Sequence, residues 1–126
     1  MSGNDTTSQS TQAIGKHAED LAARFLEQRG LRILARNFRC RGGEIDLVCR
    51  DGRALVFDEV RLRRNERFGG AGASITLRKQ ERVILAARHY LAAHGGADGD
   101  CRFDCVLLSG SEAKAIEWER NAFSEN

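Results

Sequence analysis

Apolar positions along this chain repeat with two different periods, and their order predicts a succession of helices and strands. Apolar side chains recur at helical spacing over residues 13–29, and Gly30 supplies the stop. A second helical pattern covers residues 77–94, after an N-cap at Thr76. These two segments are the expected main helices of the fold.

Segments with the alternation or the continuous apolar character of strands fill the rest of the chain. They cover residues 31–39, 44–50, 54–63, 102–109 and 115–119. The order is helix, three strands, helix, two strands, which predicts one α/β domain over residues 13–126, with a mixed central sheet of about five strands flanked by two main helices. Residues 1–12 are rich in Ser, Thr and Gln and predict a disordered tail.

Two adjacent strands carry the candidate chemistry. They read Gly43-Glu44-Ile45-Asp46-Leu47-Val48 and Phe57-Asp58-Glu59-Val60-Arg61. Between them, Asp51-Gly52 favours a two-residue hairpin turn, which pairs Asp46 with Phe57. Glu59 is then the diagonal neighbour of Asp46 on the same face. Arg61 points the same way because strand side chains alternate.

Two acids and a cation on one face are what a metal-dependent phosphodiesterase needs. The carboxylates hold a hard divalent cation, which activates water and neutralises the phosphate. Spacing alone favours a plainer interpretation, a solvated ion-pair network that contributes little. The register is a second open point, since an odd-length loop or a bulge would move Asp46 to the face of Asp58.

Asp58 is an anomaly in its own strand. It interrupts an apolar row made by Val56, Val60 and Leu62. An aspartate among buried apolar neighbours costs roughly 2–7 kcal/mol unless it finds a partner. The sequence does not indicate such a partner.

Composition places the chain among globular, cytoplasmic proteins. Its 126 residues suffice for one core, and 41% are hydrophobic and 30% charged. No apolar run reaches membrane-span length, and no secretory signal opens the chain. The four cysteines lack zinc-site spacing and are expected to be free thiols.

Charge adds little by itself, because the formal net charge is only +2. Of the 20 basic residues 17 are arginine, which suits phosphate contacts but also follows from a GC-rich genome. Residues 64–74 form a glycine-rich basic loop directly after the candidate site, either a substrate-binding loop or a plain connection. Lys79 and Arg82 fall on the first turns of the second helix, where cations oppose the helix dipole.

Further motifs complete a pattern that runs through the globular part of the chain. They are Gly15-x-x-Ala18-Glu19-x-Leu21-Ala22, Gly30-Leu31-x-Ile33-Leu34-x-x-Asn37-x-Arg39, Lys79-x-x-Arg82, Arg102-Phe103-Asp104 and Asn121-Ala122-Phe123. With the acid–acid–cation hairpin, the chain resembles the restriction-endonuclease-like superfamily, whose signature is an Asp followed by Glu-x-Lys. Within it, the sequence is similar to the uncharacterised YraN-like bacterial family of predicted endonucleases.

The resemblance implies a nuclease-type scaffold that hydrolyses phosphodiester bonds of nucleic acid, with DNA as the expected substrate. Asp46 and Glu59 would bind Mg²⁺ or Mn²⁺, Glu19 would approach the site from the first helix, and Arg61 would contact the phosphate. Five basic residues would hold the nucleic-acid backbone. They are Arg63, Arg64, Arg67, Lys79 and Arg82. A homodimer is a candidate assembly, because many nucleases that cut two strands are dimers.

The sequence departs from the family pattern at two positions. Arg61 stands where the family has lysine, and Asp58 stands where it is usually apolar. Arginine cannot act as a general base, although it can clamp a phosphate or stabilise transition-state charge. Two alternatives therefore stand beside the nuclease: a nucleic-acid-binding or partner-binding protein with a degenerate site, and a structural factor that never touches nucleic acid.

Overall fold

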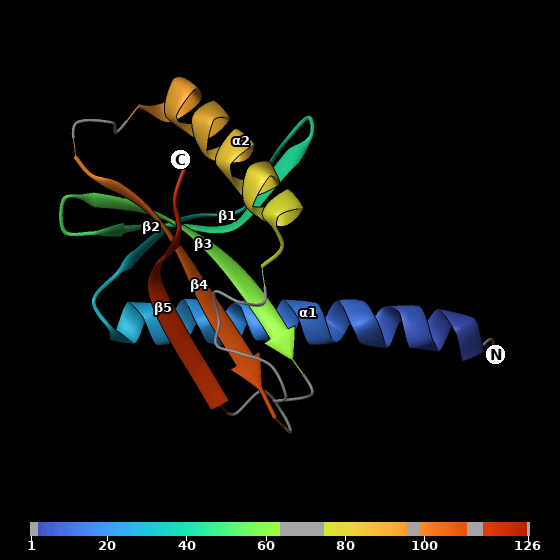
Figure 1. Cartoon of the computed structure of the whole chain (residues 1–126). Helices are drawn as coiled ribbons and strands as arrows, with labels where there is room; N and C mark the ends of the chain where they lie inside the picture. The colour runs from blue at the N-terminus through green and yellow to red at the C-terminus, as the bar shows by residue number, and fades with distance from the viewer. Residues whose placement is uncertain (1–2, 64–74, 96–98, 111–114, 126) are drawn as a thin grey trace.

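The computed structural model describes residues 3–63, 75–95, 99–110 and 115–125 of the chain, with side chains described from residue 15 onward. Two helices and five strands follow one another in the predicted order (Figure 1). They are α1 (Gly3–Gln28), β1 (Arg32–Cys40), β2 (Gly43–Asp51), β3 (Ala54–Arg63), α2 (Leu77–His94), β4 (Cys101–Ser109) and β5 (Ala115–Phe123). The predicted single α/β domain is confirmed.

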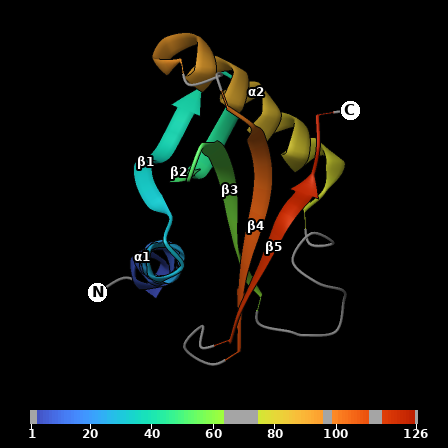
Figure 2. The ribbon, with the colours of Figure 1, turned by 90° about the vertical axis from the view of Figure 1, so that its left-hand side faces the viewer.

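All five strands belong to one mixed sheet with the spatial order β1-β2-β3-β4-β5. Neighbouring strands are antiparallel except β3 and β4, which run parallel. A parallel pair needs a crossover connection, and α2 lies in the segment that supplies it. Figure 2 looks along α1 and shows the sheet between the two helices.

Each helix covers one face of the sheet with its own set of buried side chains. The α1-face cluster consists of Ala18, Ala22, Ala23, Leu26, Leu31, Leu47, Cys49, Val56, Val106 and Leu108. The α2-face cluster consists of Ile45, Val48, Leu55, Phe57, Val83, Ala86, Ala87, Tyr90 and Phe103. Burying each large apolar side chain contributes about 1.5–3 kcal/mol. These two clusters hold the sheet and both helices in fixed relation.

The start of β2 runs unusually close to α2. A Cβ atom at Gly43 would overlap the backbone carbonyl oxygen of Arg82 and lie 3.1 Å from the amide nitrogen of Ala86. Only glycine fits here without a backbone shift. This close approach brings the next residue, Glu44, beside the first turns of α2.

The first helix is longer than the sequence pattern indicated. It begins at Gly3, so residues 3–12 are helical where a disordered tail was predicted. The chain has no proline, and no glycine lies between Gly3 and Gly15, so nothing in this stretch breaks a helix. The N-terminal half of α1 extends beyond the sheet (Figure 1). Among the described residues, no helix is long and apolar enough to cross a membrane.

The hairpin between β2 and β3 has a different register from the predicted one. Asp51 pairs with Ala54, so the two-residue loop is Gly52-Arg53, with Gly52 in the left-handed region at φ 61°. Phe57 therefore lies opposite Val48, and the predicted pairing of Phe57 with Asp46 is wrong. The shift is an even number of residues, which leaves the face of each side chain unchanged.

Candidate functional site

The candidate site lies where β2 separates from β3. Their ladder ends at the pair Leu47 and Asp58. One residue further along β2, a carboxylate oxygen of Asp46 accepts a hydrogen bond from the backbone N–H of Val60, at 2.8 Å. The side chain thus takes the place of a backbone carbonyl from the partner strand. This bond fixes the Asp46 carboxylate at the fork between the two strands.

Glu59 lies beside Asp46 at this fork. Their carboxyl groups are close enough to share a hydrogen bond when one of them is protonated. Glu59 is only 2% exposed, and its Oε1 atom has no hydrogen-bond donor among the described residues. Burial, followed by the charge of Asp46, raises the pKa of Glu59 to about 8. The two acids converge as the hairpin pattern predicted, although through a different register.

The cation at this acid pair comes from α2. The ammonium of Lys79 is 3.3 Å from Oε2 of Glu59 and 3.2 Å from Oε1 of Glu44. Burial alone would lower the pKa of Lys79, but the carboxylates of Glu59 and Glu44 outweigh it and raise that pKa. Thr76 caps the helix by accepting a hydrogen bond from the Lys79 backbone N–H. Lys79 therefore stands in the first turn of α2 because two carboxylates face it there, despite the helix dipole.

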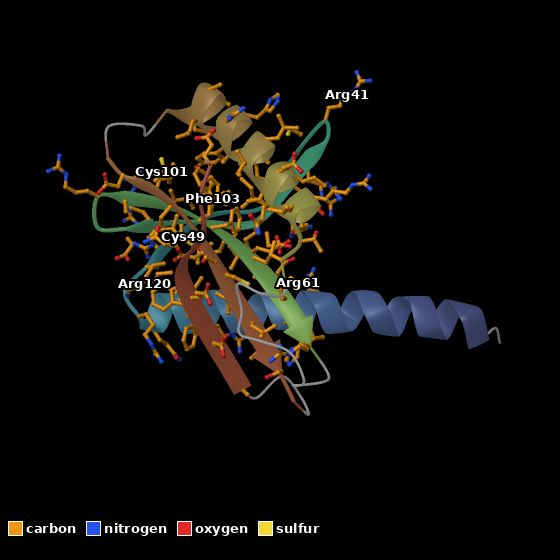
Figure 3. The ribbon with its side chains drawn as sticks, in the orientation of Figure 1. Arg41, Cys49, Arg61, Cys101, Phe103 and Arg120 are labelled. Atoms are coloured by element: carbon orange, nitrogen blue, oxygen red, sulfur yellow. The ribbon has the colours of Figure 1, made fainter. Side chains whose placement is uncertain are left out.

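Arg61 does not take part in this contact. It is half-buried on β3, two residues beyond Glu59, and it lies toward the end of that strand (Figure 3). Within the described part of the chain, Arg61 makes no hydrogen bond or ion pair. Lys79 occupies the position next to Glu59 that the sequence pattern gave to Arg61. The contact of Arg61 with a phosphate stays a prediction.

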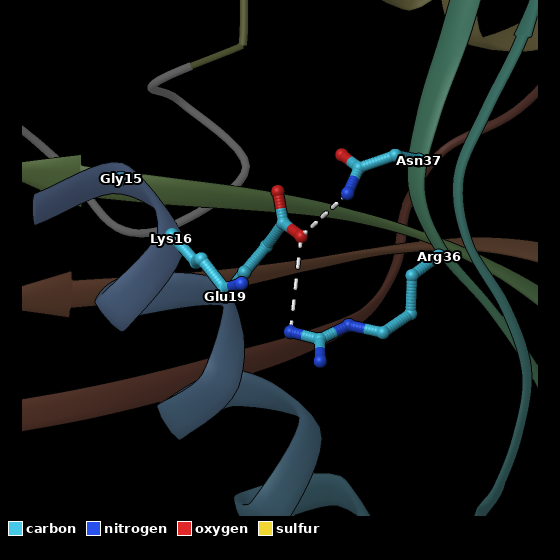
Figure 4. A pocket seen from close by; sticks show the side chains of 5 residues that line it. All are labelled: Gly15, Lys16, Glu19, Arg36 and Asn37. Carbon is cyan, nitrogen blue, oxygen red and sulfur yellow. Dashed lines mark hydrogen bonds and ion pairs between the residues drawn. The ribbon is translucent and has the colours of Figure 1, made fainter. Parts of the chain in front are cut away.

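Glu19 approaches the acid pair from the other face of the sheet. It is half-buried on α1, and its carboxylate accepts a hydrogen bond of 3.0 Å from the side chain of Asn37. Arg36 lies 3.8 Å from the same oxygen atom (Figure 4). Burial raises the pKa of Glu19, and the negative charge of Asp46 adds to that rise. Glu19 is thus within electrostatic range of Asp46.

A pocket of about 530 Å³ opens beside Glu19. It is lined by Gly15, Lys16, Glu19, Arg36 and Asn37 (Figure 4). Asn37 holds its amide toward α1 from a left-handed backbone conformation, with φ 54°. Asn37 was not among the predicted site residues. Its place in the motif that ends at Arg39 was one signal, and its residue type was another, because Asn tolerates this conformation better than most residues.

The predicted nucleic-acid-binding residues are only partly brought together. Lys79 lies in the site itself, and the guanidinium of Arg82 is 3.8 Å from Glu44 on the exposed side. Arg63 is the last residue of β3. Arg64 and Arg67 lie outside the described residues, as does the whole predicted glycine-rich loop over residues 64–74. Of the described members, Lys79 and Arg82 therefore lie together at Glu44, whereas Arg63 lies apart from them, beside β4 and β5.

The acid pair can hold a divalent cation only with help from water or substrate. Within the described ranges, no group of three or more His, Cys, Asp or Glu side chains is arranged to bind a metal. Mg²⁺ is commonly bound through one or two carboxylates, with waters and phosphate oxygens completing its shell. Asp46 and Glu59 fit that requirement, and the unpartnered Oε1 atom of Glu59 is a free oxygen ligand.

Asp58 belongs to a separate buried cluster on the α1 face. It is fully buried, and neither of its carboxylate oxygens has a hydrogen-bond partner among the described residues, although the Cys49 thiol lies beside it. Burial and the neighbouring charge of Asp104 raise the pKa of Asp58 to about 7. Asp104, directly beside it in the parallel ladder, is by contrast fully paired with Arg102 and Trp118.

Comparison with known proteins shows the family. Residues 18–108 match the model of the uncharacterised protein family UPF0102. A UPF0102 protein of Dechloromonas aromatica (strain RCB) is 58% identical over 124 residues, which cover 98% of this chain and 96% of the relative. A second, from Nitrosomonas europaea, is 57% identical over 112 residues, covering 89% and 94% of the two chains. The chain therefore belongs to the uncharacterised protein family UPF0102, which confirms its likeness to the YraN-like family.

Proposed function

We propose that this protein is a metal-dependent nuclease that hydrolyses phosphodiester bonds of nucleic acid, with DNA as the expected substrate. The observation that carries the proposal is the pair of Asp46 and Glu59 at the fork of two strands. Asp46 accepts a hydrogen bond from a backbone N–H. Glu59 is buried, and one of its carboxylate oxygens has no hydrogen-bond donor among the described residues. Mg²⁺ or Mn²⁺ is the expected cofactor.

Two like charges at close range favour the uptake of a cation. The charge of Asp46 and the burial of Glu59 both disfavour the ionised pair, so a bound divalent cation would relieve this repulsion. Lys79 offsets only part of the charge, because it contacts Glu59 and is shared with Glu44. The site is thus electrostatically incomplete in the free protein.

The chain's own residues have distinct roles in the proposed reaction. When bound, the cation supplies water activation and charge neutralisation at the phosphate. Asp46 is oriented by the Val60 N–H, and the burial of Glu59 keeps its carboxylate out of bulk water. Glu19 supports the site through water from the α1 side. The basic residues at the rim, such as Arg82, hold the nucleic-acid backbone.

Cleavage assays test this function directly. Branched, single-stranded and double-stranded DNA are incubated with the protein and Mg²⁺ or Mn²⁺. Cleavage is expected with at least one substrate, and Asp46→Asn and Glu59→Gln should abolish it. The matched control is Asp20→Asn, because Asp20 is a surface acid that pairs with Arg36 at 2.6 Å. No cleavage of any substrate by the folded wild type would refute the proposal.

A second candidate function is a nucleic-acid-binding protein with a degenerate site. It is favoured by the position of Arg61, which has no described contact with the acid pair. Restoration distinguishes the two: Arg61→Lys is compared with wild type, alone and together with Asp58→Val. Cleavage only in the restored proteins supports degeneration, whereas equal cleavage in all of them excludes it. Binding to DNA that weakens with salt is expected in either case.

A further inference from the structure

Lys79 is the only described cation in contact with the buried acid of the site. Its ammonium lies between Glu59, which is 2% exposed, and Glu44, whose side chain is 30% exposed. The Lys79 side chain itself is 21% exposed. The charge therefore sits at the boundary between the buried carboxyl pair and the surface from which a substrate would arrive.

The hydrogen-bonding capacity of this ammonium is not exhausted. A lysine ammonium has three N–H donors. Two acceptors are present, one oxygen each of Glu44 and Glu59, and no other partner of Lys79 exists in the described chain. One donor is thus left for a further acceptor. A phosphate oxygen is such an acceptor, and a charged donor strengthens the bond.

Local structure holds Lys79 where it is. Its backbone N–H is bound by the Thr76 cap, and the close approach at Gly43 sets α2 against the start of β2. The guanidinium of Arg82 lies 3.8 Å from Oε1 of Glu44, the same oxygen atom that Lys79 contacts. Lys79 therefore does not depend on a substrate to be brought to the acid pair.

We propose that Lys79 is a catalytic residue of this site. It contacts a non-bridging oxygen of the phosphodiester under attack and stabilises the charge that develops there, the part that the sequence pattern gave to Arg61. Arg61 then serves at most in holding the backbone. This inference rests on the proposed nuclease function. The ordinary alternative is a structural ion pair that only ties α2 to the sheet.

Steady-state cleavage separates these possibilities. The variants are Lys79→Met, Arg61→Met and Arg88→Met. Arg88 is an exposed α2 residue paired with Glu125, away from the site, and is the matched control. Lys79→Met is expected to lower kcat by about 100-fold or more, as loss of one charge-stabilising donor does. Arg61→Met is expected to lower kcat/KM by less than about tenfold, mainly through a higher KM. This is the pattern of a group that binds substrate without acting in the transition state.

Metal binding provides a readout without turnover. Mn²⁺ is titrated into each protein by calorimetry, with no nucleic acid present. Removal of one positive charge next to Glu59 should tighten Mn²⁺ binding by about fivefold or more in Lys79→Met, because two unit charges about 4 Å apart in water already change binding about fivefold and Mn²⁺ carries two. Arg61→Met and Arg88→Met should leave the dissociation constant within about twofold. Folding of each variant is checked by circular dichroism.

An unchanged Mn²⁺ dissociation constant in a folded Lys79→Met protein would place its ammonium too far from the bound cation and would overturn the inference. A folded Lys79→Met protein with wild-type kcat would overturn the inference and leave Lys79 as a structural ion pair. A larger kcat loss in Arg61→Met than in Lys79→Met would overturn it in favour of Arg61. In the last two cases the wild type still cleaves, so the nuclease proposal stands. Absence of cleavage by the wild type would instead overturn the nuclease function and this inference together.

Discussion

The buried Asp58 makes a quantitative prediction about stability. Its carboxyl group is fully buried in the α1 face, where it has no hydrogen-bond partner among the described residues and lies beside Asp104. Folding therefore favours the neutral acid. The perturbation is Asp58→Asn, which keeps the shape and removes the ionisation, with Asp58→Val as a second variant that also removes the polarity.

The magnitude follows from the pKa, which rises from 3.8 to about 7 on folding. An acid whose pKa is raised in the folded state does not lower the free energy of unfolding below its unfolded pKa. Above that pH the destabilisation grows until the pH passes the folded pKa. At 1.36 kcal/mol per unit, Asp58 lowers the free energy of unfolding by about 4 kcal/mol above pH 8. Between pH 5 and pH 8.5 the added loss is about 3 kcal/mol.

The assay is urea unfolding at pH 5 and pH 8.5, followed by circular dichroism. Between pH 5 and pH 8.5, the free energy of unfolding of the wild type should fall by about 3 kcal/mol more than that of Asp58→Asn. Other titrating groups are common to both proteins, so their contributions largely cancel in the difference. Asp20→Asn, which removes a half-buried acid paired with Arg36, should keep the wild-type slope. Parallel pH dependences of wild type and Asp58→Asn would refute the assignment of a buried, unpaired acid.

Three further predictions concern the site and its frame. Mn²⁺ at millimolar concentration should raise the melting temperature of wild type but not that of Asp46→Asn or Glu59→Gln, and equal shifts in all three would place the ion elsewhere. Gly43→Ala should lower the free energy of unfolding by about 1–3 kcal/mol, because its methyl group meets the backbone of α2; urea unfolding measures this, and no loss would contradict the close approach. Arg102→Met should lower the free energy of unfolding by about 3–5 kcal/mol, because it leaves the buried Asp104 without its charged partner. A decrease in melting temperature of only a degree or two would exclude this.

Local sequence patterns were enough to predict the order of the helices and strands and the convergence of Asp46 and Glu59. Hydrophobic periodicity is a local property, and it placed β3 at residues 54–63 as observed. Alternation then set Glu59 on a fixed face of that strand. The error in register did not alter this outcome. The turn lies at Gly52-Arg53, one residue later than predicted, which shifts the pairing of β2 with β3 by an even number of residues.

Contacts between elements distant in sequence were beyond such patterns. The ion pair between Lys79 and Glu59 depends on the distance between α2 and the sheet, which is set by packing around Gly43. Its only trace in the sequence was a cation placed against the helix dipole. The hydrogen bond from Asn37 to Glu19 likewise needs both α1 and β1 in position, and it leaves no periodic signal.

The two departures from the family pattern have different structural meanings. Asp58 lies beside the Cys49 thiol in the α1 face, whereas its neighbour Glu59 contacts Lys79 of α2, so these two carboxyl groups lie on opposite sides of β3. An aspartate in place of an apolar residue at position 58 is thus expected to affect the stability of the fold more than the chemistry of the candidate site. Arg61 stands on the strand that carries Glu59, but the ammonium next to that acid comes from another element. If Lys79 of α2 supplies the catalytic cation, as proposed, the site does not require a lysine on β3, and Arg61 alone does not decide between an active and a degenerate site.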